Sequence, residues 1–288
     1  MLASFRFKVI LSFFSFVLVG GGIFLFLQTH SGVSSRFLNS QAFYAEMPSP
    51  TRKLTLSTIS TKAARVPILV YHIIRPSYPT DSRQIIALAQ TPEVFDAQMK
   101  YLSDANYQVI TFATLENYLN KGMPLPENPV IISLDDGWSD QYTYAFPILQ
   151  KYNYTATFFV FTNPINTRGF LTWDNLKTLR DAGMTIAAHS RSHPFLNKIT
   201  DPAILWNEIN GSKQTLEKNL GITVREFAYP FGQYNATTTA MVRKAGFASA
   251  RGDYIRKDGL QRAELLYELN AFNVPTTTEL FIKKMKAL

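Results

Sequence analysis

The sequence contains no cysteine, which excludes disulfide bonds, thiol nucleophiles and zinc sites built on thiolates. Charged residues are sparse, at 17% of the chain, and only four histidines are present. Basic residues outnumber acidic ones by 29 to 21, but they are scattered and form no basic cluster with interleaved aromatic residues, so nucleic-acid binding is not predicted. Hydrophobic residues make up 46% of the 288 residues, which is enough for one sizeable core without disulfides.

One long hydrophobic run lies near the amino terminus. Arg6 and Lys8 precede an uncharged stretch, residues 9–27, which as a helix rising about 1.5 Å per residue approaches the hydrocarbon thickness of a bilayer. The positive flank predicts that the remainder lies outside the cytoplasm, at the cell envelope. A cleaved signal peptide, which would make the protein secreted, usually has a shorter apolar core of about 7–15 residues. We therefore favour an uncleaved membrane anchor over residues 1–28.

Residues 29–65 are rich in serine, threonine and proline and predict a linker, followed by a globular domain over residues 66–288. In this domain, apolar strands separated by helices predict a parallel sheet covered on both faces, and about seven such units favour a barrel. The predicted strands are Ile68–His72, Val130–Asp135, Ala156–Phe161, Thr185–His189, Glu226–Phe231, Phe247–Arg251 and Ala271–Val274. The predicted helices are Pro92–Asn106, Phe112–Lys121, Asp140–Tyr152, Trp173–Ala182, Pro202–Leu220, Thr237–Ala245 and Thr277–Lys286.

Two of the predicted strands end in side chains that bind metals. One runs into Asp135 and Asp136, and another ends at His189, four residues before His193. A carboxylate and two imidazoles are a common ligand set for a divalent metal with an open position. Histidines at this spacing would share one face of a helical turn. Because the other carboxylate is then free to act as a general base toward water, the pattern predicts metal-assisted hydrolysis.

Each of these residues also has a purely structural interpretation. Asp135 and Asp136 could form a solvated turn, and the two histidines could begin a helix without a metal. His72, which ends the first predicted strand, could pack against the barrel floor. Asp174 could either orient a metal-bound histidine or cap a helix. The polar stretch 251–254 is interpreted as a turn. The presence of both the aspartate pair and the histidine pair favours the metal site.

The motifs, taken in order, resemble those of the polysaccharide deacetylases, carbohydrate esterase family 4 with the NodB-homology fold. Ser133-Leu-Asp-Asp-Gly137 is similar to the family's Thr-Phe-Asp-Asp-Gly, and His189-Ser-Arg-Ser-His-Pro194 to its His-Ser/Thr-x-x-His-Pro. Phe227-Ala-Tyr-Pro-Phe-Gly232 resembles the third motif. Ile68-Leu-Val-Tyr-His72 resembles the opening strand of a subgroup that includes exported poly-N-acetylglucosamine deacetylases. The resemblance covers residues 67–274, nearly all of the globular part.

The resemblance implies an α/β fold, a distorted (β/α)7 barrel, and metal-dependent removal of N-acetyl groups from N-acetylglucosamine-containing polysaccharide. By position, Asp136, His189 and His193 would bind the divalent metal, with zinc expected and cobalt or nickel as alternatives. Asp135 would be the general base. Phe231 would offer its backbone N–H to the oxyanion. The expected partners are therefore an N-acetylated polysaccharide and, through the amino-terminal helix, a membrane.

The sequence departs from this family at three places. The late Leu-x-His motif, which often supplies the proton donor, has no histidine in residues 269–274, so we expect His72 to donate the proton instead. Residues 227–229 lack the arginine that often orients the base, and a second arginine common in the subgroup is replaced by Ala271 or Asn273. These departures leave two alternatives open: a weakly active metal-binding protein that grips a glycan during export, and an esterase acting on O-acetyl groups.

Overall fold

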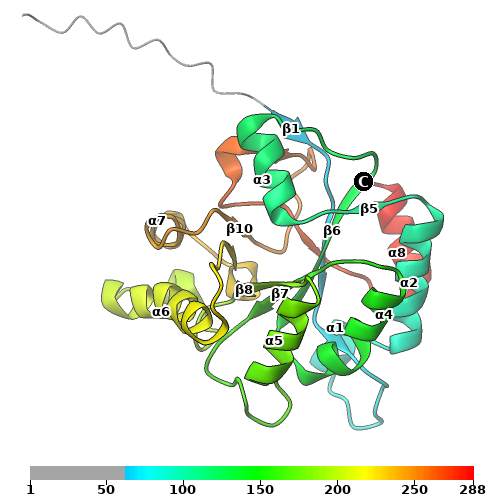
Figure 1. The fold of residues 1–288 in the computed structure, drawn as a ribbon, viewed down its shortest axis with the longest axis horizontal. Coiled ribbons are helices and arrows are strands. Elements are labelled where there is room, and N and C mark those ends of the chain that lie inside the picture. The colour runs from blue at the N-terminus through cyan, green and yellow to red at the C-terminus, as the bar shows by residue number, and fades with distance from the viewer. Residues whose placement is uncertain (1–61) are drawn as a thin grey trace, which may run out of the picture. The chain divides into compact units, whose positions relative to one another are not determined.

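The computed structural model describes residues 62–288, whose fold is shown in Figure 1. The predicted membrane segment, residues 1–28, and most of the predicted linker lie outside these described residues. Within residues 62–288, no helix combines the length and the apolar character needed to cross a bilayer. The described residues belong to one structural unit.

A parallel sheet forms the centre of this unit, with its strands in the order β10-β9-β8-β7-β6-β2-β12. The strands are β2 (Ile68–Tyr71), β6 (Pro129–Asp136), β7 (Thr157–Val160), β8 (Thr185–Ala188), β9 (Glu226–Ala228), β10 (Ser249–Arg251) and β12 (Phe272–Asn273). Each of the seven predicted strands is therefore confirmed, with differences of a few residues at the ends. All seven strands run in the same direction, so their carboxyl ends meet at one edge of the sheet.

The expected α/β architecture is present, but the sheet is a parallel half-barrel rather than the distorted (β/α)7 barrel that the resemblance implies. In the part of the chain that the structure describes, the edge strands β10 and β12 do not pair with each other. A single parallel bridge between Arg251 and Leu269 lies in the connection between them. That connection contains only the short strand β11 (Gln261–Arg262) and a single 3-10 turn, Ala263–Leu265. Because no full helix follows β10, the last βα unit that a barrel requires is missing.

Side chains of the sheet alternate between two apolar cores. In β2, Ile68 and Val70 belong to one core, whereas Leu69 and Tyr71 belong to the other. Helix α3 (Phe112–Lys121) packs on the first core, and the remaining long helices pack on the second. Burial on both faces explains why these strands appear in the sequence as continuous apolar runs.

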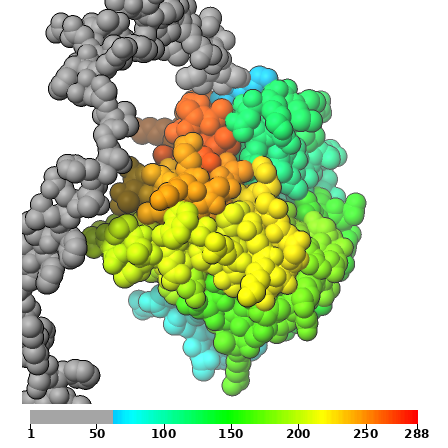
Figure 2. Space-filling view, turned by 60° about the vertical axis from the view of Figure 1, so that its left-hand side comes forward, coloured from blue at the N-terminus to red at the C-terminus, as the bar shows by residue number. Residues whose placement is uncertain are grey.

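The predicted helices are present, with one interruption. They are α2 (Pro92–Asp104), α3, α4 (Phe146–Lys151), α5 (Trp173–Asp181), α6 (Pro202–Leu220), α7 (Ala236–Lys244) and α8 (Thr278–Lys286). The helix predicted over residues 140–152 is divided into a π-helical turn, η1 (Gln141–Ala145), and α4. Helix α1 (Arg83–Leu88) was not predicted. Figure 2 shows α6, coloured yellow, and α7, coloured orange, against each other on one face of the domain.

Short strands complete the fold. Strand β1 (Ala63–Ala64) pairs with β11. Strands β3 (Ile73–Ile74) and β4 (Ala89–Gln90) pair beside the carboxyl end of β2. Strand β5 (Gln108–Val109) pairs with the start of β6. These pairings are too short to produce a periodic pattern in the sequence.

Candidate metal centre and active site

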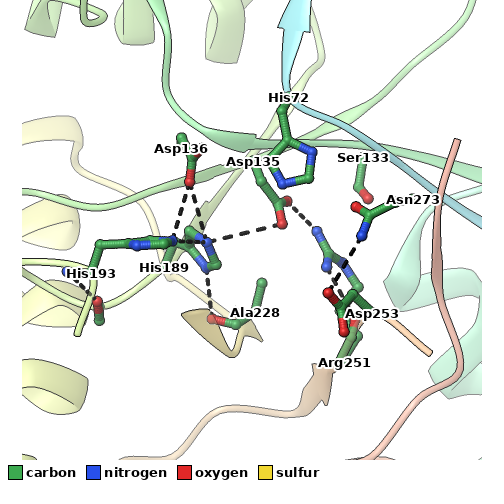
Figure 3. A network of polar contacts seen from close by, with 12 residues as sticks. His72, Ser133, Asp135, Asp136, His189, His193, Ala228, Arg251, Asp253 and Asn273 are labelled. Atoms are coloured by element: carbon green, nitrogen blue, oxygen red, sulfur yellow. Dashed lines mark hydrogen bonds and ion pairs between the residues drawn. The ribbon is translucent and has the colours of Figure 1, made fainter. Parts of the chain in front are cut away.

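The two adjacent aspartates at the end of β6 point in different directions. Asp136 has a φ of 73° and Gly137 a φ of 74°, so the chain leaves the strand through two left-handed residues. A side chain at Gly137 would not fit, because its Cβ would lie 2.8 Å from Cγ1 of Val160. The turn directs Asp136 toward the histidine pair, whereas Asp135 faces Arg251 (Figure 3).

The loop after β8 brings His189 and His193 together without forming a helical turn, so that prediction is wrong. Ser190 and His193 are left-handed, with φ of 67° and 60°. The backbone N–H of His193 donates a hydrogen bond to the Ser190 hydroxyl at 3.0 Å, which closes the loop. The imidazoles nevertheless meet, and their Nε2 atoms lie 3.1 Å apart.

Asp136, His189 and His193 converge on one point (Figure 3). Asp136 Oδ1 lies 3.6 Å from His189 Nε2 and 3.3 Å from His193 Nε2. Ligand atoms that bind a tetrahedral ion at about 2.0–2.2 Å lie about 3.3–3.6 Å from one another, so these spacings match a shared cation. Asp136 Oδ1 is also buried without a hydrogen-bond partner, which is unusual for a carboxylate oxygen. The donor set therefore fits a zinc-class ion.

Hydrogen bonds hold two of these ligands in position. His189 Nδ1 donates to the carbonyl oxygen of Ala228 at 2.8 Å, which leaves Nε2 as the free acceptor for a metal. Trp138 Nε1 donates to Asp136 Oδ2 at 3.0 Å and leaves Oδ1 free. The side chain of Asp174, by contrast, is 90% exposed, so its interpretation as the partner of a metal-bound histidine is wrong.

The predicted metal ligands shift one another's pKa values. Burial alone would raise the pKa of Asp136, but the adjacent imidazoles of His189 and His193 lower that pKa well below its usual range. Burial alone would lower the pKa of His189, but Asp136 and Asp135 raise it above its ordinary value of 6.5 overall. In the metal-free protein, Asp136 is therefore ionised and His189 binds a proton readily. A cation that binds here displaces that proton.

Asp135 is paired with Arg251, a residue that the sequence analysis missed. Arg251 Nη2 donates to Asp135 Oδ1, and the centre of its guanidinium lies 4.5 Å from the centroid of the Phe159 ring. In the sheet, Arg251 lies directly beside Ala228, which belongs to the stretch 227–229 that lacks the expected arginine. Residues 227–229 lack an arginine, as the sequence shows, and Asp135 is instead contacted by an arginine from the neighbouring strand. One sequence feature could have identified Arg251 as a site residue: it is a charged residue at the end of the apolar run that begins at Phe247.

His72 lies beside Asp135 at the end of β2 and lines the same cavity (Figure 3). The side-chain amide of Gln141 donates to the carbonyl oxygen of His72 at 2.8 Å and to that of Asp135 at 2.5 Å. Gln141 thereby ties the ends of β2 and β6 together. Burial lowers the pKa of His72, although the charges of Asp135 and Asp136 oppose this effect, so the imidazole is neutral near pH 7.

These side chains surround a cavity of about 350 Å³. Phe231, in a left-handed conformation with φ of 57°, forms part of its wall. Trp138, Phe161 and Phe170 form an aromatic wall. The structure brings into this cavity all the site residues that the sequence predicts: His72, Asp135, Asp136, His189, His193 and Phe231.

Glu208 of α6 holds the loop between the two histidines, and the sequence analysis did not anticipate this role. Its Oε2 accepts hydrogen bonds from the backbone N–H groups of Arg191 and Ser192, at 3.0 and 2.9 Å. Its Oε1 accepts a third hydrogen bond from the Ser192 hydroxyl at 2.7 Å. A single carboxylate therefore fixes the backbone that connects His189 to His193.

We expect Glu208→Ala to weaken zinc binding about tenfold or more, because the freed loop must be ordered again each time both histidines engage the ion. The affinity is measured by competition with a chelating dye. Glu279→Ala, which alters the exposed first turn of α8, is the matched control and should leave the affinity unchanged. An unchanged zinc affinity in Glu208→Ala would show that the loop holds its shape without this carboxylate.

Several known proteins are similar to this chain in both sequence and fold. The sequence profile described as "Polysaccharide deacetylase" matches residues 122–250. YxkH of Bacillus subtilis, a protein assigned to the polysaccharide deacetylases, is 31% identical over 186 residues, which cover 65% of this chain and 63% of YxkH. The chain therefore spans somewhat less than two thirds of that relative. A poly-beta-1,6-N-acetyl-D-glucosamine N-deacetylase from Staphylococcus aureus is 27% identical over 218 residues, covering 68% of this chain and 73% of the enzyme.

Solved structures agree with this similarity. The deacetylase PplD of Streptococcus pyogenes, solved in complex with acetate, superposes with a TM-score of 0.70 at 26% identity, covering 78% of this chain and 99% of PplD. IcaB from Ammonifex degensii superposes with a TM-score of 0.68 at 22% identity, covering 77% of this chain and 95% of IcaB, and shows the same fold. With its aspartate and histidine motifs assembled in an α/β half-barrel of the NodB type, the chain contains a domain that matches the polysaccharide deacetylases in sequence and fold.

Proposed function

We propose that this protein is a metal-dependent hydrolase that removes N-acetyl groups from N-acetylglucosamine-containing polysaccharide at the cell envelope. The observation that carries the proposal is the convergence of Asp136, His189 and His193 beside a separate carboxylate, Asp135. The substrate class is supported by the poly-N-acetylglucosamine deacetylase among the relatives. The location rests on the apolar segment within residues 1–28, which would anchor the domain outside the cytoplasm.

Different residues of the cavity have different roles in the proposed amide hydrolysis. Asp136, His189 and His193 would hold a divalent ion, zinc first among the candidates. Such an ion strengthens water as a nucleophile near neutral pH and polarises the amide carbonyl. Asp135 takes the proton of the attacking water, and the hydrogen bond from Arg251 orients this carboxylate.

Two further steps complete the reaction. The backbone N–H of Phe231 donates a hydrogen bond to the carbonyl oxygen as negative charge develops on it. The carbon–nitrogen bond then breaks, acetate leaves, and the sugar nitrogen needs a proton. His72 supplies this proton. Because burial keeps the resting imidazole neutral, His72 must first receive a proton, and it receives one from the neighbouring Asp135.

We expect His72→Gln to lower kcat for acetate release at least about 100-fold, the usual contribution of a positioned proton donor. Zinc content should be unchanged, because His72 does not belong to the ligand cluster. Both quantities are measured on the same preparation, by an acetate assay and by metal analysis. Activity close to that of the wild type would remove His72 from the mechanism and leave Asp135 to return the proton.

The proposal is tested with the full-length protein, purified with zinc, cobalt or nickel. Acetate release is measured on a panel of β-1,6-linked N-acetylglucosamine oligomers, chitin oligomers, peptidoglycan fragments and an O-acetylated glycan. Release from at least one N-acetylated substrate is expected. Binding without release would instead favour the glycan-gripping alternative, and release from the O-acetylated glycan alone would favour the esterase. The pairing of Arg251 with Asp135 removes one reason for expecting weak activity.

A further inference from the structure

Two exposed phenylalanines, Phe195 and Phe231, lie at the rim of the cavity, and the mechanism above uses neither of their side chains. The side chains of Phe195 and Phe231 are 49% and 45% exposed. Their rings stack with centroids 4.0 Å apart and planes 15° apart. Phe195 lies in the loop after β8, and Phe231 in the loop after β9, so the pair joins two separate catalytic loops.

The stacked pair extends outward from the metal ligands. The Phe231 ring packs edge-on against His193, with centroids 4.5 Å apart, and Phe231 also forms part of the cavity wall. Among residues 62–288, eight large hydrophobic side chains are exposed, and only these two stack on each other. Apolar surface that is left in water beside a cavity is typical of a ligand-binding surface.

The size of the cavity indicates which part of a bound polysaccharide would contact the stacked phenylalanines. Ligand pockets usually have volumes of about 300–1,000 Å³, and a cavity of about 350 Å³ accommodates one acetylated sugar. In a polysaccharide, the neighbouring sugar must therefore lie on the rim. A β-linked pyranose of the gluco configuration carries its hydroxyl groups equatorially, so that both of its faces expose C–H groups, and such a face packs on an aromatic ring.

We propose that the Phe195–Phe231 stack is a subsite that binds the sugar adjacent to the one being deacetylated, and that it selects a β-gluco pyranose ring. The subsite rests on the proposed function, because it deepens the description of the same substrate. It makes the enzyme sensitive to chain length: an oligomer long enough to cover both the cavity and the stack binds more tightly than a single sugar.

The kinetic test compares a long substrate with a short one. Phe195→Ala in the full-length protein should raise KM for a β-linked N-acetylglucosamine pentamer about tenfold, the loss expected for one aromatic contact, with kcat within twofold of the wild type. Hydrolysis of p-nitrophenyl acetate, which is too small to reach the rim, should change by less than twofold. Phe195→Tyr should retain pentamer binding. Ile204→Ala, at an exposed hydrophobic residue of α6 outside the cavity wall, is the matched control.

A binding test separates this subsite from the proposed function. In an Asp135→Asn background, where turnover is not required, pentamer affinity is measured by calorimetry with and without Phe195→Ala. An approximately tenfold weaker affinity supports the subsite even if no acetate is ever released. Equal affinities would overturn it, as would an equal loss on pentamer and p-nitrophenyl acetate, which would mean that Phe195 only supports the fold of the catalytic loop.

Discussion

We expect Asp135→Asn to reduce kcat for acetate release by about 10²–10⁴-fold, the range typical of a lost general base. The amide of asparagine has nearly the shape of the carboxylate but cannot accept the proton of the attacking water. Zinc should remain bound, because Asp135 Oδ2 is 3.9 Å from His189 Nε2 and Asp135 is not part of the ligand cluster. Acetate release and zinc content measured on one preparation check both statements.

The burial of Arg251 requires a control for folding. The side chain of Arg251 is 1% exposed, and breaking a buried ion pair by removing one charge costs about 3–5 kcal/mol. Asparagine keeps an oxygen that accepts the Arg251 hydrogen bond, so part of this loss is avoided. Thermal unfolding of Asp135→Asn shows whether the variant is folded at the assay temperature.

Asp174→Asn supplies the matched control, because it makes the same substitution at an exposed carboxylate of α5 and should leave both turnover and zinc binding unchanged. If folded Asp135→Asn turns over at the wild-type rate, Asp135 is not the base. If zinc is lost together with activity, Asp135 is a ligand and the division of roles between the two aspartates is wrong.

The strands and the main site residues were predictable because they depend on local patterns. A strand buried on both faces is an apolar run in the sequence, and each of the seven runs is a strand of the sheet. Polar residues that interrupt such runs at their carboxyl ends must share one edge of a parallel sheet. This argument places Asp135, Asp136 and His189 together without any knowledge of the strand order.

Supporting residues were missed because their partners are distant in sequence. Arg251 pairs with a residue 116 positions away, and only the parallel register of β9 and β10 places it beside Ala228. Glu208 binds a loop 16 to 17 positions earlier, from the middle of a helix with an otherwise ordinary pattern. Neither contact follows from composition or periodicity, since both depend on how complete elements pack.

The shape of the histidine loop was also beyond local reasoning. The spacing of the two histidines is compatible with a helical turn, and helical periodicity alone predicts one. The chain instead adopts left-handed conformations at Ser190 and His193, held by a hydrogen bond between these two residues and by Glu208. A tertiary contact therefore selects the loop conformation. This loop brings the two imidazoles together, as a helical turn would also have done.

We expect His193→Ala to weaken zinc binding by at least about 100-fold, because loss of a direct ligand should exceed the 10–100-fold cost of losing an outer hydrogen bond. The partly exposed His193 leaves a gap that water can fill, so the fold should survive. Affinity is measured by competition with a chelating dye, and thermal unfolding of the metal-free forms provides the control. Retained affinity would show that Asp136 and His189 bind the ion without His193.

The wild-type zinc affinity should also depend on pH, in a direction fixed by the ligands. The pKa of Asp136 lies below its usual range, so this carboxylate stays ionised and does not respond near neutral pH. The pKa of His189 is raised above 6.5, so at pH values below this raised pKa zinc must displace a proton, and affinity falls about tenfold per pH unit.

Metal-free protein should show the opposite trend in stability. A raised pKa means that the folded state holds the His189 proton more tightly than the unfolded chain does. The protonated His189 therefore adds to the free energy of unfolding. This addition is complete below the ordinary histidine pKa and is lost as the pH rises through the raised pKa of His189. As the pH rises from 6.5 through the raised pKa of His189, the metal-free protein should therefore lose this part of its stability while zinc binding strengthens. Zinc affinity that is independent of pH over this range would mean that binding displaces no histidine proton, and that the pKa of His189 is not raised in the metal-free protein.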